Sequence, residues 1–266
     1  MSKIDLRSNR KLIWTLSKND FKTRYAGSYL GAVWAMVQPV ITVLMYYIVF
    51  DKIFQSRSEA VAGDTPIPYV LFLTAGLVPW FYFSEGLMQG TLALTQYDYL
   101  VKKVVFNIDI LPIIKVTAAT FIHGFFAVVL LIIASVYHYY PTVYTLQIIY
   151  YSVCLYLLIL SFSYITSAIM VFFRDISQII SIVLQIGMWA TPILWNIGKL
   201  SPTWQMILKL NPLVYIISGY RTSICEKKWF FYDWKYTLYF WCFVGVFYFV
   251  GRRLFTRLKV HFADVL

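Results

Sequence analysis

Long apolar runs separated by short polar segments make up most of this chain. A helix needs about 20 mostly apolar residues to cross a bilayer. Six segments approach or exceed that length: Leu30–Phe50, Ile67–Leu87, Ile110–Tyr137, Leu146–Phe173, Ile179–Asn196 and Tyr236–Val250. The pattern therefore predicts an all-α integral membrane protein with six transmembrane helices.

The apolar stretch Met188–Ile217 is interrupted in a way that no single spanning helix accepts. Pro192, Pro202 and Pro212 each remove a backbone donor, and the apolar pieces between them are too short to cross a bilayer. Irregular backbone at membrane depth is tolerated only inside protein or beside a water-filled cavity. We expect two short re-entrant helices in the outer leaflet between spans five and six. An amphipathic loop on the outer membrane surface is the alternative.

The segment before the first span mixes basic residues with apolar ones at helical spacing. Leu12, Ile13, Leu16 and Phe21 occur at roughly helical spacing among Lys and Arg. This pattern is typical of an amphipathic helix that lies in the membrane interface. We therefore divide the chain into an N-terminal interfacial segment, 1–28, and a transmembrane domain, 29–266. A solvated basic leader is the alternative.

Composition supports the membrane interpretation and argues against a nucleic-acid-binding protein. The chain is 60% hydrophobic and 13% charged, whereas soluble domains carry about 25% charged residues. Its net charge of +11 is not gathered into the basic stripe typical of nucleic-acid binding. We expect no cleavable signal peptide, because no short apolar run with a suitable cleavage site follows the basic start. If both termini are in the cytoplasm, the cytoplasmic segments carry more Lys and Arg than the outer ones. The positive-inside rule therefore favours this orientation.

The chain lacks the motifs of the common enzyme classes. No phosphate-binding loop, zinc-protease motif or nucleophile elbow is present. Ionisable residues in the predicted spans are functional candidates because their burial in lipid is costly; these are Glu85, Lys115, Arg174 and Asp175. They are too few for a proton relay. Glu85 and Lys115 could pair across helices and Arg174 could anchor its helix, so a structural role is the alternative.

The loop Thr95–Pro112 is the one substantial connection predicted on the cytoplasmic side. Aromatic and aliphatic residues alternate there with charged ones, as in a short helix that docks into a groove of a partner. A solvated turn is the alternative, although a turn does not require so many apolar residues.

Several local strings resemble the membrane permeases of ABC-type polysaccharide exporters, which include O-antigen, capsule and wall teichoic acid systems. The strings are YLGAVWAMVQP at Tyr29–Pro39, FFRD at Phe172–Asp175, ATPILW at Ala190–Trp195, LNPLVYIISGYR at Leu210–Arg221 and HFADVL at His261–Leu266. They occur in the expected order and are spread from the first span to the last residue, so the resemblance covers essentially the whole chain.

The resemblance implies a half-transporter in the bacterial cytoplasmic (inner) membrane. Two copies would form a channel for a polyprenyl-linked glycan, and two separate ATP-binding subunits would bind ATP and Mg, with no cofactor on this chain. Recognition of the glycan end would also lie on those subunits. In this family the N-terminal helix and the loop after the second span contact the ATPase. The matching residues are Arg10, Lys18, Lys22, Arg24, Tyr97, Asp98, Tyr99, Lys102 and Lys103.

Aromatic side chains are the candidates for the channel and its outer gate. Rings can stack on the CH faces of sugars without fixing one register, so a polymer can slide. The candidates are Trp34, Tyr46, Tyr47, Trp189 and Trp195; ordinary packing aromatics are the alternative. A small-molecule exporter on the same plan is the main competing function. A glycan polymerase or other membrane enzyme would need a cluster of ionisable residues, and a purely structural scaffold would not need the interrupted segment.

Overall fold

The fold is a bundle of helices of unequal length. The structure is a computed structural model, and it describes residues 6–24, 26–27, 29–53, 61–62, 65–102 and 106–266. Four helical segments in this part of the chain are long and apolar enough to cross a membrane: Tyr69–Thr91, Ile108–Val136, Val143–Phe172 and Trp234–Val265. They coincide with the predicted second, third, fourth and sixth spans. The sixth continues well past its predicted end at Val250.

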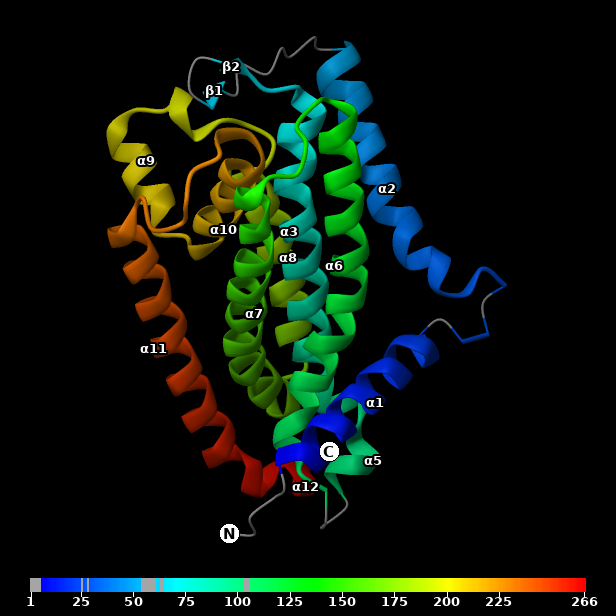
Figure 1. Cartoon of the computed structure of the whole chain (residues 1–266). Helices are drawn as coiled ribbons and strands as arrows, with labels where there is room; N and C mark the ends of the chain where they lie inside the picture. The colour runs from blue at the N-terminus through cyan, green and yellow to red at the C-terminus, as the bar shows by residue number, and fades with distance from the viewer. Residues whose placement is uncertain (1–5, 25, 28, 54–60, 63–64, 103–105) are drawn as a thin grey trace.

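Three helices form the core of the bundle: α3 (Tyr69–Thr91), α6 (Leu111–Val136) and α7 (Gln147–Phe172). They run side by side through the centre of the molecule (Figure 1). Small residues allow this close packing: a Cβ on Gly90 would overlap the side chain of Ser163, and Thr91 donates a 2.8 Å hydrogen bond to Thr166. Small and hydroxyl side chains are the usual means of joining helices in lipid, where apolar burial does not drive association.

The helix α11 (Trp234–Leu258) lies along α7 on the other side of the bundle. After a 3₁₀ turn, Lys259–His261, the chain ends in α12 (Phe262–Val265). Phe262 is fully buried and packs against Phe172 and Phe255. The C-terminal segment is therefore fixed to the bundle.

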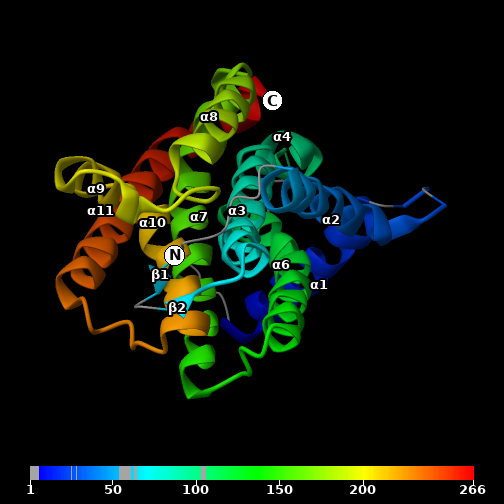
Figure 2. The ribbon, with the colours of Figure 1, turned by 90° about the horizontal axis from the view of Figure 1, so that it is seen from above.

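The predicted first span is helical over nearly all of its length but changes helix type, and the predicted fifth span ends earlier than expected. Helix α2 (Trp34–Tyr46) follows a 3₁₀ turn, Gly31–Val33, and continues as a π-helical segment, Tyr47–Ile53. Helix α8 (Ile176–Ala190) ends before Pro192, because proline cannot continue the helix. Both helices flank the core (Figure 2). No residue of α2 is buried, and α8 buries only Ile180.

The first helix, α1, and the last, α12, lie at one end of the bundle, here called the α1 end (Figure 1). It holds α1 (Leu6–Arg24), α4 (Ala93–Gln96), α5 (Asp98–Val101) and the 3₁₀ turn Ile108–Ile110. The sequence predicts that both termini share one side, and this arrangement agrees. The cytoplasmic assignment of that side stays a prediction.

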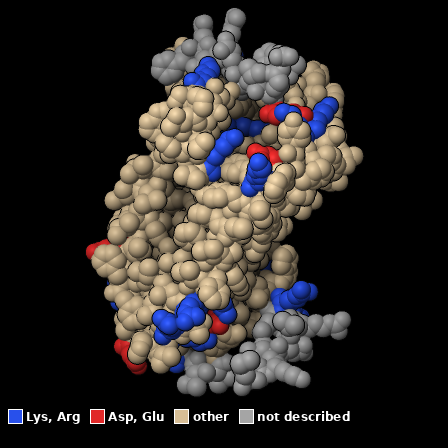
Figure 3. Space-filling view, turned by 90° about the vertical axis from the view of Figure 1, so that its left-hand side faces the viewer, with Lys and Arg blue, Asp and Glu red and all other residues tan. Residues whose placement is uncertain are grey.

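The opposite end, here called the α9 end, holds the interrupted segment. It contains α9 (Pro202–Lys209), α10 (Pro212–Arg221), the π turn Thr222–Glu226, the 3₁₀ turns Val143–Leu146 and Ile197–Lys199, and the antiparallel pair β1 (Val61–Ala62) and β2 (Thr65–Pro66). The two short helices predicted here are present; their insertion into the outer leaflet stays a prediction. Figure 3 shows charged side chains of one face gathered toward the two ends, with a broad uncharged band between them.

Candidate functional site

The inward face of α1 is built around a buried carboxylate, Asp20. Ile13, Ser17 and Asp20 follow one another at spacings of three and four residues, which places them on one side of a helix. Ser17 and Asp20 are buried, and the Ser17 hydroxyl donates a 3.1 Å hydrogen bond to the carbonyl of Ile114 on α6. Trp14 and Phe21 pack edge-on against Phe121 of the same helix. Helix α1 is thereby fastened to α6.

Asp20 joins three further elements of the fold. Its Oδ1 lies 2.5 Å from Lys115 Nζ of α6 and accepts a 2.7 Å hydrogen bond from the Tyr97 hydroxyl, between α4 and α5. Its Oδ2 lies 3.1 Å from Arg24 Nη2, and Arg24 in turn pairs with Glu85 of α3 through Nη1 at 2.5 Å. We call these five residues, Asp20, Arg24, Glu85, Tyr97 and Lys115, the Asp20 network.

The charges of the Asp20 network balance. Lys115 is only 4% exposed, and a buried cation is costly unless it is paired and hydrogen-bonded. Asp20 supplies that pair, and the ring of Tyr97 lies 4.7 Å from Lys115 Nζ as a further partner. Burial and the Asp20 carboxylate both raise the pKa of Tyr97. Its hydroxyl therefore remains a donor to Asp20 throughout the physiological pH range.

The Asp20 network corrects one expectation from the sequence. Glu85 and Lys115 do not pair with each other; Arg24 and Asp20 stand between them. Asp20 was not among the residues predicted from the sequence, because this residue was treated as one charge within a basic leader. A signal was available, since Asp20 lies on the same helical face as Ile13 and Leu16 and four residues before Arg24.

The remaining coupling candidates divide into an outward and an inward set. Arg10, Lys18 and Lys22 are exposed on the outer side of α1, and Tyr99 and Lys102 are exposed on and beside α5. Asp98 is half-buried, and its carboxylate accepts a 2.6 Å hydrogen bond from the Tyr99 backbone N–H. Tyr97 and Arg24 instead point into the bundle as members of the Asp20 network. Lys103 lies outside the described residues.

A second cluster at the α1 end centres on Asp109, just before α6. Its carboxylate pairs with Lys259 at 2.6 Å and with Arg252 at 3.3 Å, both near the C-terminus. The Tyr164 hydroxyl donates to the Asp109 carbonyl at 3.0 Å. Two other sequence candidates, Arg174 and Asp175, are exposed in the turn between α7 and α8, at the same α1 end of the bundle.

At the α9 end, Arg221 holds the interrupted segment in place. Its guanidinium donates to the carbonyls of Pro192 and Ile193, both at 2.7 Å, and to the carbonyl of Phe72 at 3.3 Å. The guanidinium carbon also lies 3.5 Å from the centroid of the Phe72 ring. Among the described residues, no carboxylate forms an ion pair with it. Arg221 is satisfied instead by backbone carbonyls that the break after α8 leaves without helical donors.

Other polar contacts enclose the same break. Asn211 accepts from the Leu213 N–H at the start of α10 and donates a 3.2 Å hydrogen bond to Thr191. The Tyr69 hydroxyl of α3 donates to the Leu194 carbonyl at 3.1 Å. Gly76 is needed beside Arg221, because a Cβ there would come within 2.8 Å of the guanidinium. The irregular backbone of residues 191–194 is thus buried in protein, which is a condition for irregular backbone within a membrane.

The structure places the channel candidates at different levels. Trp34 begins α2 near the α1 end, whereas Trp189 lies at the far end of α8 and is 58% exposed. Trp195 donates its indole N–H to the Trp189 carbonyl at 3.1 Å. Tyr46 contacts Met188 of α8, and Tyr47 lies beneath Lys52. One chain therefore does not bring Trp34 and Trp189 together.

Helix α8 carries an uncovered polar stripe that the sequence analysis missed. Gln178, Ser181 and Gln185 are all exposed, together with Trp189. Spacings of three and four residues place them on one face. Helical periodicity of these polar residues was the available signal. The stripe faces away from the core of its own chain.

Comparison with known proteins identifies the family. The ABC-2 type transporter profile matches residues 11–225. The chain is 27% identical to the O-antigen export system permease protein RfbA of Myxococcus xanthus, covering 84% of each chain. It is 26% identical to the protein of that name from Klebsiella pneumoniae, covering 96% of this chain and 95% of the relative.

A relative with a less specific name also matches. The inner membrane transport permease YadH of Escherichia coli K12 is 25% identical over 71% of this chain and 75% of its own length. The profile match covers most of the chain, from α1 to the π turn after α10. The apolar helices agree with this match: the chain belongs to the ABC-2 type transporter family, a family of membrane transport permeases and not of enzymes.

Proposed function

We propose that this chain is the transmembrane subunit of an ATP-driven exporter that moves a lipid-linked polysaccharide across the bacterial cytoplasmic membrane. Two relatives at about 26% identity over most of the chain are named O-antigen export permeases. The structural observation that carries the proposal is the uncovered polar stripe of α8, Gln178–Ser181–Gln185.

The α8 stripe supports a channel formed by two copies. Polar side chains that face lipid at membrane depth are costly and normally face a bundle interior or a water-filled cavity. A second copy related by twofold symmetry would turn its own α8 toward this one and enclose an aqueous path. Glutamine amides and the exposed ring of Trp189 would then contact the hydroxyls and CH faces of a passing glycan. Trp195 would stand at the exit, because it is tied to Trp189.

The ATP-binding partner is proposed to dock at the α1 end, which would face the cytoplasm. Arg10, Lys18 and Lys22 offer exposed positive charge there, and Tyr99 is 54% exposed on α5. Tyr97 precedes α5 and donates to Asp20. A displacement of α5 by the ATPase would therefore reach α3 and α6 through the Asp20 network.

Removal of two charges beside α5 tests the coupling proposal. We expect Asp98→Ala/Lys102→Ala to preserve assembly with the ATPase but to reduce export about tenfold, a transition-state loss of about 1.4 kcal/mol. The matched control, Asp233→Asn/Lys235→Ala, removes the same charges at the α9 end, and Asn keeps the cap at the start of α11. Export and ATP hydrolysis are measured on both variants. Unchanged export in the Asp98/Lys102 variant would remove this role.

Depletion of the chain in its native cells tests the substrate. We expect polyprenyl-linked glycan to accumulate on the inner leaflet while the same polymer disappears from the cell surface. Quantification of the lipid-linked pool by mass spectrometry also identifies the glycan. Unchanged levels would favour export of a small molecule by the same architecture.

A further inference from the structure

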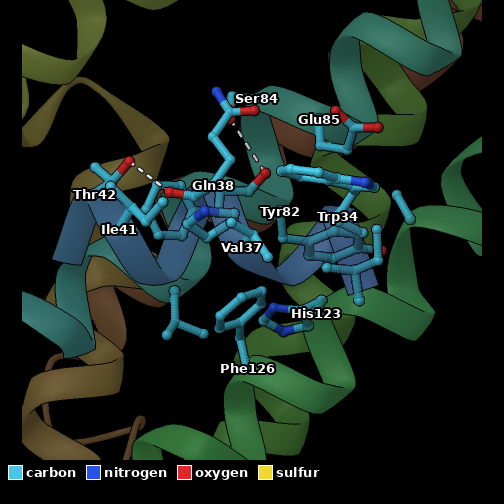
Figure 4. Close-up of a pocket in the computed structure, with 16 residues that line it drawn as sticks. Trp34, Val37, Gln38, Ile41, Thr42, Tyr82, Ser84, Glu85, His123 and Phe126 are labelled. Carbon is cyan, nitrogen blue, oxygen red and sulfur yellow. Dashed lines mark hydrogen bonds between the residues drawn. The ribbon is translucent and has the colours of Figure 1, made fainter. Parts of the chain in front are cut away.

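A pocket lies between α2, α3 and α6, away from the stripe on α8. Its volume is about 640 Å³, within the range of about 300–1,000 Å³ that is usual for small-molecule sites. Figure 4 shows side chains from the three helices lining it. The pocket exists because α2 stands apart from the core along its first turns (Figure 1).

The lining is more polar toward the α1 end than deeper in the bundle. Trp34 of α2 and Ser84 and Glu85 of α3 line the pocket toward the α1 end. Gln38, one turn further along α2, is exposed. Deeper in the bundle the walls are mainly apolar, with Ile41, Val78 and Phe126. Two polar residues, Thr42 and His123, also line this part, and both already have partners within the chain: the Thr42 hydroxyl donates to the Gln38 carbonyl, and His123 Nε2 is hydrogen-bonded to Ser152 and Tyr220. The helix directions fix this order, since α2 and α6 run away from the α1 end and α3 runs toward it.

This gradient matches an amphiphilic ligand. Apolar walls at bilayer depth accept a hydrocarbon chain, and a few polar groups at one end fix the orientation of a ligand, as in most small-molecule sites. The Gln38 amide can both donate and accept hydrogen bonds, and the Trp34 indole N–H can donate. Glu85 is held by Arg24 through one oxygen, and its side chain remains 40% exposed. The pair leaves the polar end close to neutral.

The pocket leaves one apolar face of α2 free for contact with a second copy of the chain. Val33, just before α2, and Val40 and Leu44 on it form a separate exposed stripe, at spacings of seven and four residues. The pocket residues Trp34 and Gln38 lie on a different side of the helix. A second copy can therefore pack on α2 while the pocket stays open to lipid.

We propose that this pocket binds the hydrocarbon chain of one amphiphilic lipid, with the polar head of the lipid hydrogen-bonded to Gln38 at the α1 end. Two lipids share this chemistry, a membrane phospholipid and a polyprenyl phosphate such as would anchor an exported glycan. The second assignment rests on the proposed function, whereas the first does not. In either case the head of the bound lipid lies beside Glu85, so the lipid contacts a member of the Asp20 network.

Photolabelling of the full-length chain in nanodiscs tests the proposal. One arm uses phosphatidylglycerol with a diazirine in its acyl chain, and the other uses a diazirine-bearing polyprenyl phosphate. Labelled positions are mapped by mass spectrometry while an unlabelled competitor is titrated. Ile132 of α6 is 58% exposed outside the pocket and reports labelling by bulk lipid.

We expect labelling of Val37, Val78 and Phe126 to saturate and to be competed away, whereas labelling of Ile132 rises linearly with probe. Gln38→Leu should weaken saturable labelling about three- to tenfold, the loss of one hydrogen bond. Gln96→Leu, an exposed glutamine on α4, should leave it unchanged. Gln38 is exposed, so its replacement does not threaten folding.

Each outcome separates the two ligands or overturns the site. Saturation by polyprenyl phosphate alone assigns the pocket to the substrate anchor, and saturation by phosphatidylglycerol alone assigns it to a resident phospholipid. Saturation by both supports a general amphiphile site. Linear labelling of the pocket with both probes, parallel to Ile132, overturns the proposal. The depletion experiment above does not depend on this result, so failure of the pocket leaves the export proposal standing.

Discussion

The two ends of the bundle solve the problem of buried charge in different ways. At the α1 end, Lys115 is paired with Asp20, and a tyrosine, an arginine and a second carboxylate extend the network. At the α9 end, Arg221 has three backbone carbonyls and a phenyl ring as partners. Side chains that pair with each other can exchange partners when a helix shifts. A backbone carbonyl cannot, because it moves only with the main chain to which it belongs.

This difference suggests separate mechanical roles. The Asp20 network joins α1, α3, α6 and the α4–α5 turn through flexible side chains, which suits the proposed relay from an ATP-binding partner to the helices of the bundle. Arg221 joins α10 to the break after α8 and to α3 through main-chain atoms, which suits a fixed support for the proposed outer gate. The following predictions test this contrast, in order of decreasing effect.

Arg221→Met should cause the largest loss of stability. It leaves the Pro192 and Ile193 carbonyls, and more weakly that of Phe72, without donors in a buried site, a cost on the order of 4 kcal/mol. Arg221→Lys keeps the charge but lacks the planar fork of the guanidinium, so its stability should lie between that of the parent and that of Arg221→Met. The thermal midpoint of the purified chain in detergent measures both. A Met variant as stable as the parent would show that the carbonyls find other partners and that Arg221 is not a support.

Asp20→Asn should have the next largest effect, about 2–3 kcal/mol, because Lys115 loses its anionic partner. Addition of Lys115→Met removes the unpaired cation and should restore much of the stability. Export should stay impaired in this double variant, since the relay is still broken. Asp264→Asn, at an exposed position on α12, is the control for loss of one carboxylate. Full recovery of export in the double variant would mean that the Asp20 network only stabilises the fold.

Gly219→Ala should have the smallest effect, about 1–2 kcal/mol. A Cβ at Gly219 of α10 would overlap the Tyr151 ring of α7, so the variant tests how closely the α9 end is packed. Gly245→Ala is the matched control, because it lies in α11 with no atom near its added Cβ, and alanine favours a helix. Thermal midpoints compare the two. Equal midpoints would argue that α10 can shift, contrary to a fixed support.

The sequence specified the apolar helices but not how far each one extends. Hydrophobic length located α3, α6, α7 and α11, because a spanning helix needs a run of apolar residues that is visible in one dimension. The prolines predicted the break and the two short helices that follow it. Helix α8 proved shorter than expected, since the apolar run continues through Pro192 and beyond the last helical residue, Ala190.

The tertiary structure alone decided the polar sites. Asp20 lies 95 positions from Lys115, and Arg221 lies 28, 29 and 149 positions from the three carbonyls to which it donates. Helical periodicity can place a residue on a face, but it cannot say which distant helix that face meets. Charged groups in apolar surroundings are costly without partners, so their presence in the sequence signalled that partners exist. The crossing of α1 over α6, and the return of α10 to the break after α8, determined which residues those partners are.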